Sequence, residues 1–201
     1  MLDEILSLFV ARKGHFGFES GHHGDLWLEI PAAYVRPARL RAYAAQLARL
    51  LDTHRIEAVC GPMVEGALLA QMVAEELRAE FYFAEQFVRP GLNDLYPIGY
   101  RIPEALRPGI HGKRTAVVDD VINAGSALRG AVEDLERFGA RLVGIGALLV
   151  LGPPASTFAA QKKVPLEKLS FLGESALWEP SSCPLCASGA PLDGQCDPPT
   201  R

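Results

Sequence analysis

Apolar residues recur along this chain at two different spacings, and the alternation between the two spacings predicts an α/β fold. Short apolar runs, typical of strands, cover residues 56–60, 81–84, 116–118 and 142–151. Apolar positions at helical spacing predict amphipathic helices over residues 1–13, 37–54, 67–77 and 127–138. The run at 142–151 is apolar without interruption, which is typical of a strand buried on both faces of a parallel sheet. We therefore expect a mostly parallel central sheet flanked by helices.

Three segments fall outside this alternation. Glycines and aromatic residues over 14–30 predict two strands joined by a turn at Ser20–Gly21. Residues 86–112 hold several glycines and prolines and few apolar runs, which predicts a long hairpin or an irregular segment. The end of the chain is rich in proline, glycine, serine and cysteine. These shifts predict a single domain over residues 1–175 and a Cys/Pro-rich C-terminal tail over 176–201.

Length and charge narrow the range of functions. A chain of 201 residues, of which 49% are hydrophobic, is sufficient for one domain with a full core. The net charge of −4 argues against nucleic-acid binding, which favours a basic face. No apolar run reaches the roughly 20 residues that a membrane span needs. The first residues, with Asp3 and Glu4, do not resemble a secretion signal, so we expect a cytoplasmic protein.

The strongest chemical signal follows the strand at 116–118. Two carboxylates, Asp119 and Asp120, end this strand, and a short turn with Gly125 and Ser126 leads into the next helix. The N-terminus of a helix presents free N–H groups and the positive end of a dipole, which suit a phosphate. Carboxylates repel phosphate, but they hold Mg²⁺ or accept hydrogen bonds from sugar hydroxyls. The alternative is a solvated acidic turn without a ligand.

A second glycine loop, Gly61–Gly66, has the spacing of a nucleotide-binding P-loop. The two residues that follow it are Ala67 and Leu68, whereas P-loop chemistry requires lysine and then serine or threonine. A P-loop nucleotide hydrolase is therefore disfavoured.

The run Val117-Val-Asp-Asp-Val-Ile-Asn-Ala-Gly-Ser-Ala127 resembles the phosphoribosyl-pyrophosphate (PRPP) motif of type I phosphoribosyltransferases. The resemblance implies the fold of that family and transfer of the 5-phosphoribosyl group of PRPP to a nucleobase, with Mg²⁺ as cofactor. In this interpretation Asp119 and Asp120 are catalytic and hold the ribose hydroxyls and the metal ion. The residues implied to bind PRPP are Asp119, Asp120, Val121, Ile122, Asn123, Ala124, Gly125, Ser126 and Ala127, the pyrophosphate loop Gly61, Pro62, Met63, Val64, Glu65 and Gly66, and Arg89.

Within that family, the chain is most similar to orotate phosphoribosyltransferases. Residues 14–36 resemble their small N-terminal hood, which implies contacts with the base from Phe16, Ser20, Gly21 and Trp27. Residues 86–112 occupy the place of their long flap, where Arg101 would act in catalysis by balancing the charge on the departing pyrophosphate. Members of the family pair so that one subunit's flap reaches its neighbour's site, which implies a homodimer.

The acceptor base stays open at this point. Asn123 cannot take a proton at neutral pH, which favours orotate, a base that is already anionic, over purines. Glu19 and Glu65 stand where orotate enzymes usually have lysine, and both disfavour an anionic substrate. Orotate, and hence pyrimidine nucleotide synthesis, is the first hypothesis. The alternatives are another base, or a regulator of the same fold that binds PRPP without turnover.

Most of the cysteines lie near the end of the chain. Cys183-Pro-Leu-Cys186 is a C-x-x-C pair, which can supply half of a tetrahedral Zn²⁺ site, with Cys196 as a third ligand and a fourth from elsewhere, such as a second subunit. The alternative is reduced thiols in a loose tail. His22 and His23 are expected to be exposed turn residues rather than a pair of metal ligands.

Overall fold

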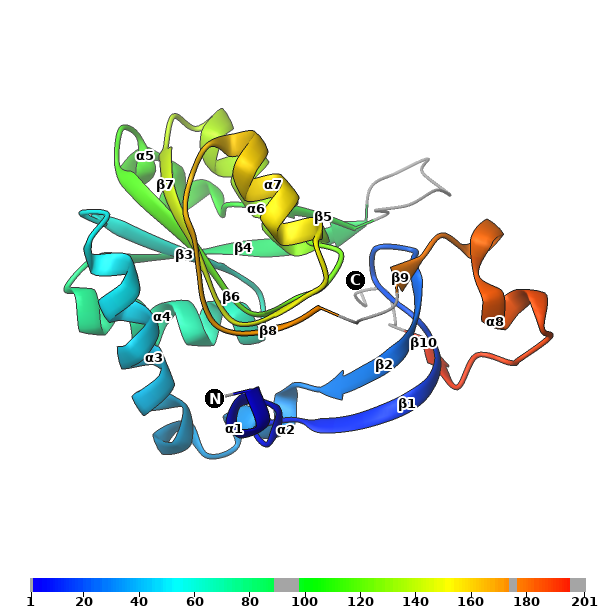
Figure 1. Cartoon of the computed structure of the whole chain (residues 1–201). Coiled ribbons are helices and arrows are strands. Elements are labelled where there is room, and N and C mark those ends of the chain that lie inside the picture. The colour runs from blue at the N-terminus through cyan, green and yellow to red at the C-terminus, as the bar shows by residue number, and fades with distance from the viewer. Residues whose placement is uncertain (1, 89–97, 174–176, 196–201) are drawn as a thin grey trace.

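The computed structural model describes residues 2–88, 98–173 and 177–195, in which a central sheet lies between helices and a smaller sheet lies beside it (Figure 1). The helices are α1 (Leu2–Leu6), α2 (Pro31–Tyr34), α3 (Pro37–Asp52), α4 (Glu65–Leu77), α5 (Arg107–Ile110), α6 (Ser126–Arg137), α7 (Pro154–Lys162) and α8 (Pro184–Ala187), with 3-10 turns at Glu104–Leu106 and Pro180–Ser182. The strands are β1 (Val10–Gly17), β2 (His23–Glu29), β3 (Ala58–Pro62), β4 (Glu80–Val88), β5 (Ile98–Arg101), β6 (Arg114–Ile122), β7 (Arg141–Leu151), β8 (Leu166–Leu172), β9 (Leu177–Trp178) and β10 (Gly194–Gln195). None of the helices in the described ranges is both long and apolar enough to cross a membrane.

The central sheet has the strand order β5-β4-β3-β6-β7-β8. Every neighbouring pair is parallel except β4 and β5. The expectation of a mostly parallel sheet flanked by helices is therefore confirmed. Because parallel strands end at the same edge of a sheet, the glycine loop after β3 and the acidic pair of β6 come to one edge.

Apolar side chains cover both faces of this sheet. On one face, Val117 of β6 belongs to a buried cluster with residues of α6 and α7. On the other face, Ala116 and Val118 belong to a second cluster with residues of α1, α3 and α4. Burial on both faces requires apolar residues at successive positions of a strand, which explains the uninterrupted apolar run of β7.

The smaller sheet, called the hood sheet here, has the strand order β10-β1-β2-β9 (Figure 1). β1 and β2 form an antiparallel hairpin, in whose turn the Gly21 N–H donates to the Phe18 carbonyl at 2.8 Å. Gly21 has φ +80, and the predicted turn at Ser20–Gly21 is confirmed. β9 pairs with β2, and β10 pairs with β1. The C-terminal segment thus completes a sheet that begins near the N-terminus.

The helix predicted over residues 1–13 is wrong beyond its first turns. α1 ends at Leu6, and the chain enters β1 at Val10. Val10–Lys13 pairs with β2, and Arg12 forms an ion pair with Glu29 across the two strands, Nη2 to Oε1 2.8 Å. Pairing between strands therefore overrides a local helical spacing, as tertiary context often does.

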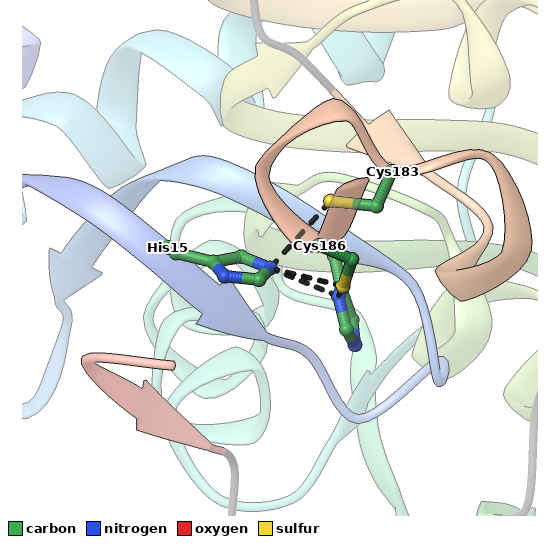
Figure 2. A group of neighbouring side chains, drawn as sticks. His15, Cys183 and Cys186 are labelled. Carbon is green, nitrogen blue, oxygen red and sulfur yellow. Dashed lines mark hydrogen bonds between the residues drawn. The ribbon is translucent and has the colours of Figure 1, made fainter. Parts of the chain in front are cut away.

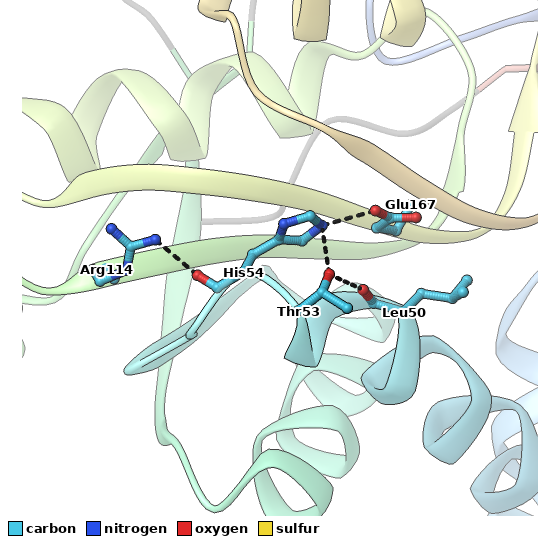
Figure 3. A network of polar contacts seen from close by, with 5 residues as sticks. All are labelled: Leu50, Thr53, His54, Arg114 and Glu167. Atoms are coloured by element: carbon cyan, nitrogen blue, oxygen red, sulfur yellow. Dashed lines mark hydrogen bonds and ion pairs between the residues drawn. The ribbon is translucent and has the colours of Figure 1, made fainter.

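A polar network ties the end of α3 to the central sheet (Figure 3). His54 Nε2 lies 2.8 Å from Glu167 Oε1 of β8, and the Thr53 hydroxyl donates to the Leu50 carbonyl at 3.1 Å. Arg114 of β6 donates from Nη2 to the His54 carbonyl at 2.9 Å. These bonds satisfy backbone carbonyls at the helix end and hold α3 over β6 and β8.

The range predicted as a flap is only partly irregular. β4 and β5 pair as an antiparallel hairpin, with Val88 opposite Ile98. Residues 89–97, among them Arg89, lie outside the described residues. After β5, Ile102 and Ile110 are fully buried in the core, so this part of the chain packs against the domain. Because single isoleucines among prolines and polar residues form no periodic pattern, this packing could not be predicted from the sequence.

Candidate functional site

A cavity of about 400 Å³ opens where β6 ends, between the turn that follows this strand and the β1–β2 hairpin. From β6, the turn and the start of α6, the lining residues are Asp119, Val121, Ile122, Asn123, Ala124, Gly125, Ser126 and Ala127. From the hairpin and the segment after it they are Phe18, Glu19, Ser20 and 26–31, and Glu65, Gln86 and Leu151 complete the set. The predicted phosphate turn and the predicted base-binding hairpin therefore face the same cavity.

The turn after β6 lines this cavity and leads directly into α6. Gly125 has φ +78 and immediately precedes α6. Residues with a Cβ rarely adopt this conformation, which explains the glycine. The Arg129 N–H donates to the Gly125 carbonyl at 2.9 Å, and the earlier N–H groups of the first turn have no partner within the helix. The turn can therefore bind an anion such as phosphate.

Asp119 and Asp120 are buried at the end of β6, with 8% and 3% of their surface exposed. Asp119 lines the cavity, whereas Asp120 Oδ2 accepts a hydrogen bond from the Tyr34 hydroxyl at 3.0 Å. Asp120 Oδ1 accepts the Val121 N–H at 2.6 Å, and Asp119 Oδ1 accepts the Asp120 N–H at 3.1 Å. No sequence pattern pointed to Tyr34, which comes from α2.

Burial raises the pKa of both carboxyl groups, because the charged form loses its hydration. The neighbouring Asp120 raises the pKa of Asp119 further, well above its usual range. The pKa of Asp120 is raised to about 7, although the bonds from Tyr34 and Val121 offset part of the effect of burial. The nearby Glu65 charge adds to both shifts. A pair of this kind favours a ligand that brings positive charge or hydrogen-bond donors.

The Glu19 carboxylate joins the hood hairpin to three other elements. Gln86 of β4 donates from Nε2 to Glu19 Oε2 at 3.0 Å, and the Tyr100 hydroxyl of β5 lies 2.9 Å from both carboxylate oxygens. The Ser126 hydroxyl, at the start of α6, donates to Glu19 Oε1 at 3.2 Å. Burial raises the pKa of Glu19, while the bonds from Tyr100 and Ser126 lower it. The sequence identified Glu19 only as a departure from lysine, and no sequence pattern connected it to Gln86 or Tyr100.

The cavity lining is acidic. Its charged members among the described residues are Glu19, Glu29, Glu65 and Asp119, and none of the described lining residues is lysine, arginine or histidine. A polyphosphate would be repelled here unless a cation entered with it. Trp27 lines the cavity too, and its buried Nε1 has no hydrogen-bond partner in the described part of the chain. An unpaired buried donor suits an acceptor atom of a ligand.

Some of the predicted site residues lie outside this lining. Of the pyrophosphate loop only Glu65 lines the cavity, and Met63 and Val64 are exposed. Phe16 is buried against Trp27, with the ring centroids 5.6 Å apart, and Gly21 forms the hairpin turn. The remaining loop residues outside the lining are Gly61, Pro62 and Gly66.

Arg101 does not line this cavity either. It borders a second hollow together with Arg107 and Arg137. Its guanidinium lies 5.5 Å from the Phe87 ring centroid, and its Nε lies 3.9 Å from Glu85 Oε2. A role at the departing pyrophosphate would require movement of the β4–β5 hairpin, and this role stays a prediction.

Known proteins of one family resemble this chain along most of its length. Residues 32–168 match a family model described as "Phosphoribosyl transferase domain". The chain is 31% identical to an orotate phosphoribosyltransferase of Thermotoga petrophila, with 96% of each chain covered. It is 30% identical to an orotate phosphoribosyltransferase of Thermus thermophilus, with 90% of this chain and 91% of the relative covered.

Solved structures show the same fold at lower identity. An orotate phosphoribosyltransferase from Aeropyrum pernix matches with a TM-score of 0.62 and 21% identity, over 86% of this chain and 94% of that chain. An adenine phosphoribosyltransferase from Giardia lamblia, complexed with 9-deazaadenine, matches with a TM-score of 0.64 and 17% identity, over 86% of this chain and 98% of that chain. At these identities the likeness concerns the fold alone.

Proposed function

We propose that this chain, which belongs to the phosphoribosyltransferase family, transfers the 5-phosphoribosyl group of PRPP to orotate and releases pyrophosphate. The observation that carries the proposal is the shared cavity of about 400 Å³, where the acidic strand end and the phosphate turn face the hood hairpin. A cavity of this size is typical of small-molecule sites. Support for orotate comes from the curated relatives, which carry that name at 31% and 28% identity.

In this proposal the residues of the chain hold the ribose at two places. Backbone N–H groups of the turn from Ala124 to Ala127 bind the 5′-phosphate at the N-terminus of α6. Asp119, which lines the cavity, accepts hydrogen bonds from the ribose hydroxyls, and Asp120, which lies outside the lining, would exchange its bond from Tyr34 for one from the ribose. The hood covers the base and excludes water, which would otherwise react with the oxocarbenium-like ribose.

Positive charge must come from outside the described lining. Mg²⁺ fits, because the carboxylate oxygens of Asp119 and Glu65 are ligands that it prefers and because the lining is acidic. When bound beside Asp119 and Asp120, it would neutralise charge on the leaving pyrophosphate. We also propose a homodimer, in which the flap of one subunit supplies a positively charged side chain to its neighbour's site.

The identity of the base depends on Glu19 and Asn123, which both line the cavity. An amide cannot act as a general base, so Asn123 cannot deprotonate a purine; orotate is already anionic through its carboxylate, and its N1 proton would pass to another acceptor such as the leaving pyrophosphate. A charged Glu19 would repel the orotate carboxylate. The raised pKa of Glu19 reduces this conflict, because a protonated carboxyl can donate a hydrogen bond to the substrate carboxylate. A neutral base meets no such conflict, and a phosphoribosyltransferase for a neutral base is the alternative.

A screen of nucleobases tests the proposal. Purified protein with PRPP and Mg²⁺ is offered orotate, uracil, adenine, hypoxanthine or guanine, and pyrophosphate release is measured. We expect release with orotate well above release with the other bases. Turnover with a neutral base alone would favour the alternative. Tight PRPP binding without turnover on any base would favour a PRPP-binding regulator of the same fold.

The variant Glu19→Gln is expected to lower the KM for orotate at pH 8 by about 3- to 10-fold, because one like charge near the substrate carboxylate is removed. Glutamine keeps an oxygen acceptor for Tyr100 and Ser126, so the contacts between the elements are largely retained. Steady-state kinetics at pH 6 and pH 8 measure the effect, which should be smaller at the lower pH, because burial raises the pKa of Glu19 and so increases its protonated fraction there. An unchanged KM at both pH values would place the orotate carboxylate away from Glu19.

The variant Gly125→Val is expected to weaken binding of ribose 5-phosphate more than Ser126→Ala does. Gly125 has φ +78, and a β-branched residue is strongly disfavoured there, so the turn would reorient its N–H groups. A Cβ at this position meets Arg129 Nε and Ile122 Cγ2 only at 3.9 Å, so the effect comes from backbone conformation rather than overlap. Calorimetric titration measures both variants. Equal, negligible effects would show that the phosphate binds elsewhere.

A further inference from the structure

Four metal-ligating side chains gather on the hood sheet, outside the cavity lining. They are His15 of β1, His23 of β2, and Cys183 and Cys186 at the start of α8 and within it, and their ligand atoms all lie within 4.8 Å of one another. Figure 2 shows both cysteine side chains directed at the ring of His15. The expectation that His23 is an exposed turn residue is wrong, because it is half-buried and its Nδ1 lies 3.2 Å from Cys186 Sγ.

The spacing of these atoms is close to that of a tetrahedral zinc shell. Bond lengths of about 2.3 Å to sulfur and 2.0–2.1 Å to nitrogen place tetrahedral ligand atoms about 3.3–3.8 Å apart. His15 Nε2 lies 3.5 Å from Cys183 Sγ, 3.7 Å from Cys186 Sγ and 3.0 Å from His23 Nδ1. Shifts of a few tenths of an ångström would bring these pairs with His15 to zinc spacing, and the widest pair of the four, which lies within 4.8 Å, would close by up to about 1 Å.

The surroundings of His15 hold its ring in the form that a metal needs. His15 Nδ1 lies 2.9 Å from the Ala190 carbonyl, an acceptor, so Nδ1 carries the proton and the lone pair of Nε2 points at the cysteines. The backbone of His15 is held as well, because its N–H donates to Asp193 Oδ2 at 2.8 Å and its carbonyl accepts the Asp193 N–H at 2.7 Å. His15 also lies where the pairing of β1 with β2 shifts register, between Lys13 and Phe16.

We infer that His15, His23, Cys183 and Cys186 form a structural Zn²⁺ site that clamps the C-terminal segment onto the hood hairpin. Two thiolates and two imidazoles in a tetrahedral arrangement select zinc over magnesium or calcium. Four protein ligands close the shell, so the site has no open position for a substrate. Cys186 is exposed, which gives the ion a path of entry, whereas His15 and Cys183 are buried.

This site differs from the one expected from sequence. The C-x-x-C pair is retained, but the ligands that complete it come from the hood of the same chain rather than from a second subunit. Cys196 lies outside the described residues and is not needed for the shell. The clamp would act on the cavity only indirectly, by holding a hairpin whose Phe18, Ser20 and Trp27 line it. The inference does not depend on which base, or whether any base, is the substrate.

Metal analysis of the full chain tests the inference. Protein purified without a metal-binding tag should contain about one Zn²⁺ per chain, as measured by inductively coupled plasma mass spectrometry. After zinc is removed under reducing conditions, Co²⁺ should restore one equivalent and show the thiolate charge-transfer band of a tetrahedral site. Hydrogen exchange of residues 177–195 should accelerate on zinc removal, while exchange in α3 should stay unchanged.

Two matched variants locate the ion. His23→Asn should lose the stoichiometric metal, whereas His22→Asn, at the adjacent position, should retain it, because His22 Nδ1 lies beside Ser20 Oγ instead of the cysteines. Cys183→Ser should lose the charge-transfer band. The inference is overturned if the reduced wild-type protein takes up neither Zn²⁺ nor Co²⁺, or if His23→Asn and Cys183→Ser both keep the full metal content. A disulfide between the two cysteines with no metal uptake after reduction would also overturn it.

Discussion

Asp120→Asn is expected to weaken PRPP binding and, at the same time, to stabilise the ligand-free protein at pH 8. Loss of one charge-assisted hydrogen bond costs about 1–3 kcal/mol, or roughly 5- to 150-fold in Kd. The stabilisation arises because asparagine is neutral, whereas aspartate holds a charge in a position with only 3% of its surface exposed. Asparagine still offers an oxygen to the Tyr34 hydroxyl, so that hydrogen bond can be kept.

The stability that Asp120→Asn gains over the wild type should increase as the pH rises. Burial raises the pKa of Asp120 from 3.8 to about 7 in the folded protein. Between these two values the folded state binds more protons than the unfolded state, so the free energy of unfolding falls as pH rises. Above pH 7 the loss is complete, and Asp120→Asn should then gain about 1–3 kcal/mol relative to the wild type. Near pH 4 the gain should be small.

Thermal unfolding at pH 5 and pH 8, and calorimetric titration with Mg²⁺ and PRPP, measure the two effects. Asp134→Asn is a suitable control, because Asp134 is a buried aspartate of α6 that lies outside the cavity lining. Its Oδ2 accepts the Ile102 N–H at 2.7 Å and its Oδ1 lies 3.5 Å from Arg137 Nη1, so asparagine loses an ion pair as well as a charge-assisted bond. This variant should be less stable at both pH values and should bind PRPP normally. Unchanged PRPP affinity when Asp119 and Asp120 are both asparagine would refute the assigned site.

Gly61→Ala is expected to lower the free energy of unfolding by about 2–3 kcal/mol and the Tm by roughly 5–10 °C, with loss of PRPP binding. A Cβ on Gly61 would overlap the Gly66 carbonyl oxygen and lie 2.7 Å from Ala67 Cα. These are backbone atoms at the start of α4, which cannot yield as a flexible side chain does. The loop between β3 and α4 would therefore open, and Glu65 would move away from Asp119.

Gly112→Ala is the control that distinguishes the steric overlap at Gly61 from the general cost of replacing a glycine. Gly112 has φ +75, but a Cβ there meets no atom of the described residues within 4 Å. Only the backbone conformation opposes alanine, at a cost of about 1 kcal/mol, and the site is untouched. Thermal unfolding and PRPP titration of both variants make the comparison. Equal losses of stability, with PRPP binding kept in Gly61→Ala, would show that the contact between Gly61 and Gly66 is not essential.

The central sheet and the turn after β6 could be predicted from sequence because their signals are local. A strand, Asp119 and Asp120, Gly125 and a helix follow one another within a single short stretch. The hood sheet could not be predicted in full, since its outer strands β9 and β10 are each only two residues long. A strand of that length has no periodic pattern, and its pairing with β1 or β2 depends on the folded chain.

The same limit explains what was missed at the two sites. Glu19 is separated from Gln86 by 67 residues and from Tyr100 by 81, and no spacing rule connects them. The C-x-x-C pair was visible because its cysteines are close in sequence, whereas His15 lies 168 residues before Cys183. At each site the sequence therefore identified residues that lie close together along the chain. Their long-range partners could be found only from the structure.

The placement of β9 and β10 on either side of the β1–β2 hairpin sets an order for folding during synthesis. All six strands of the central sheet have been translated once the ribosome reaches residue 172, while both outer strands of the hood sheet are still missing. A hairpin of two strands alone is marginally stable in water. Its unpaired edges also offer a template for the hairpin of another nascent chain. The hood sheet can therefore be completed only after the whole central sheet has been synthesised, and until then the β1–β2 hairpin keeps two unpaired edges.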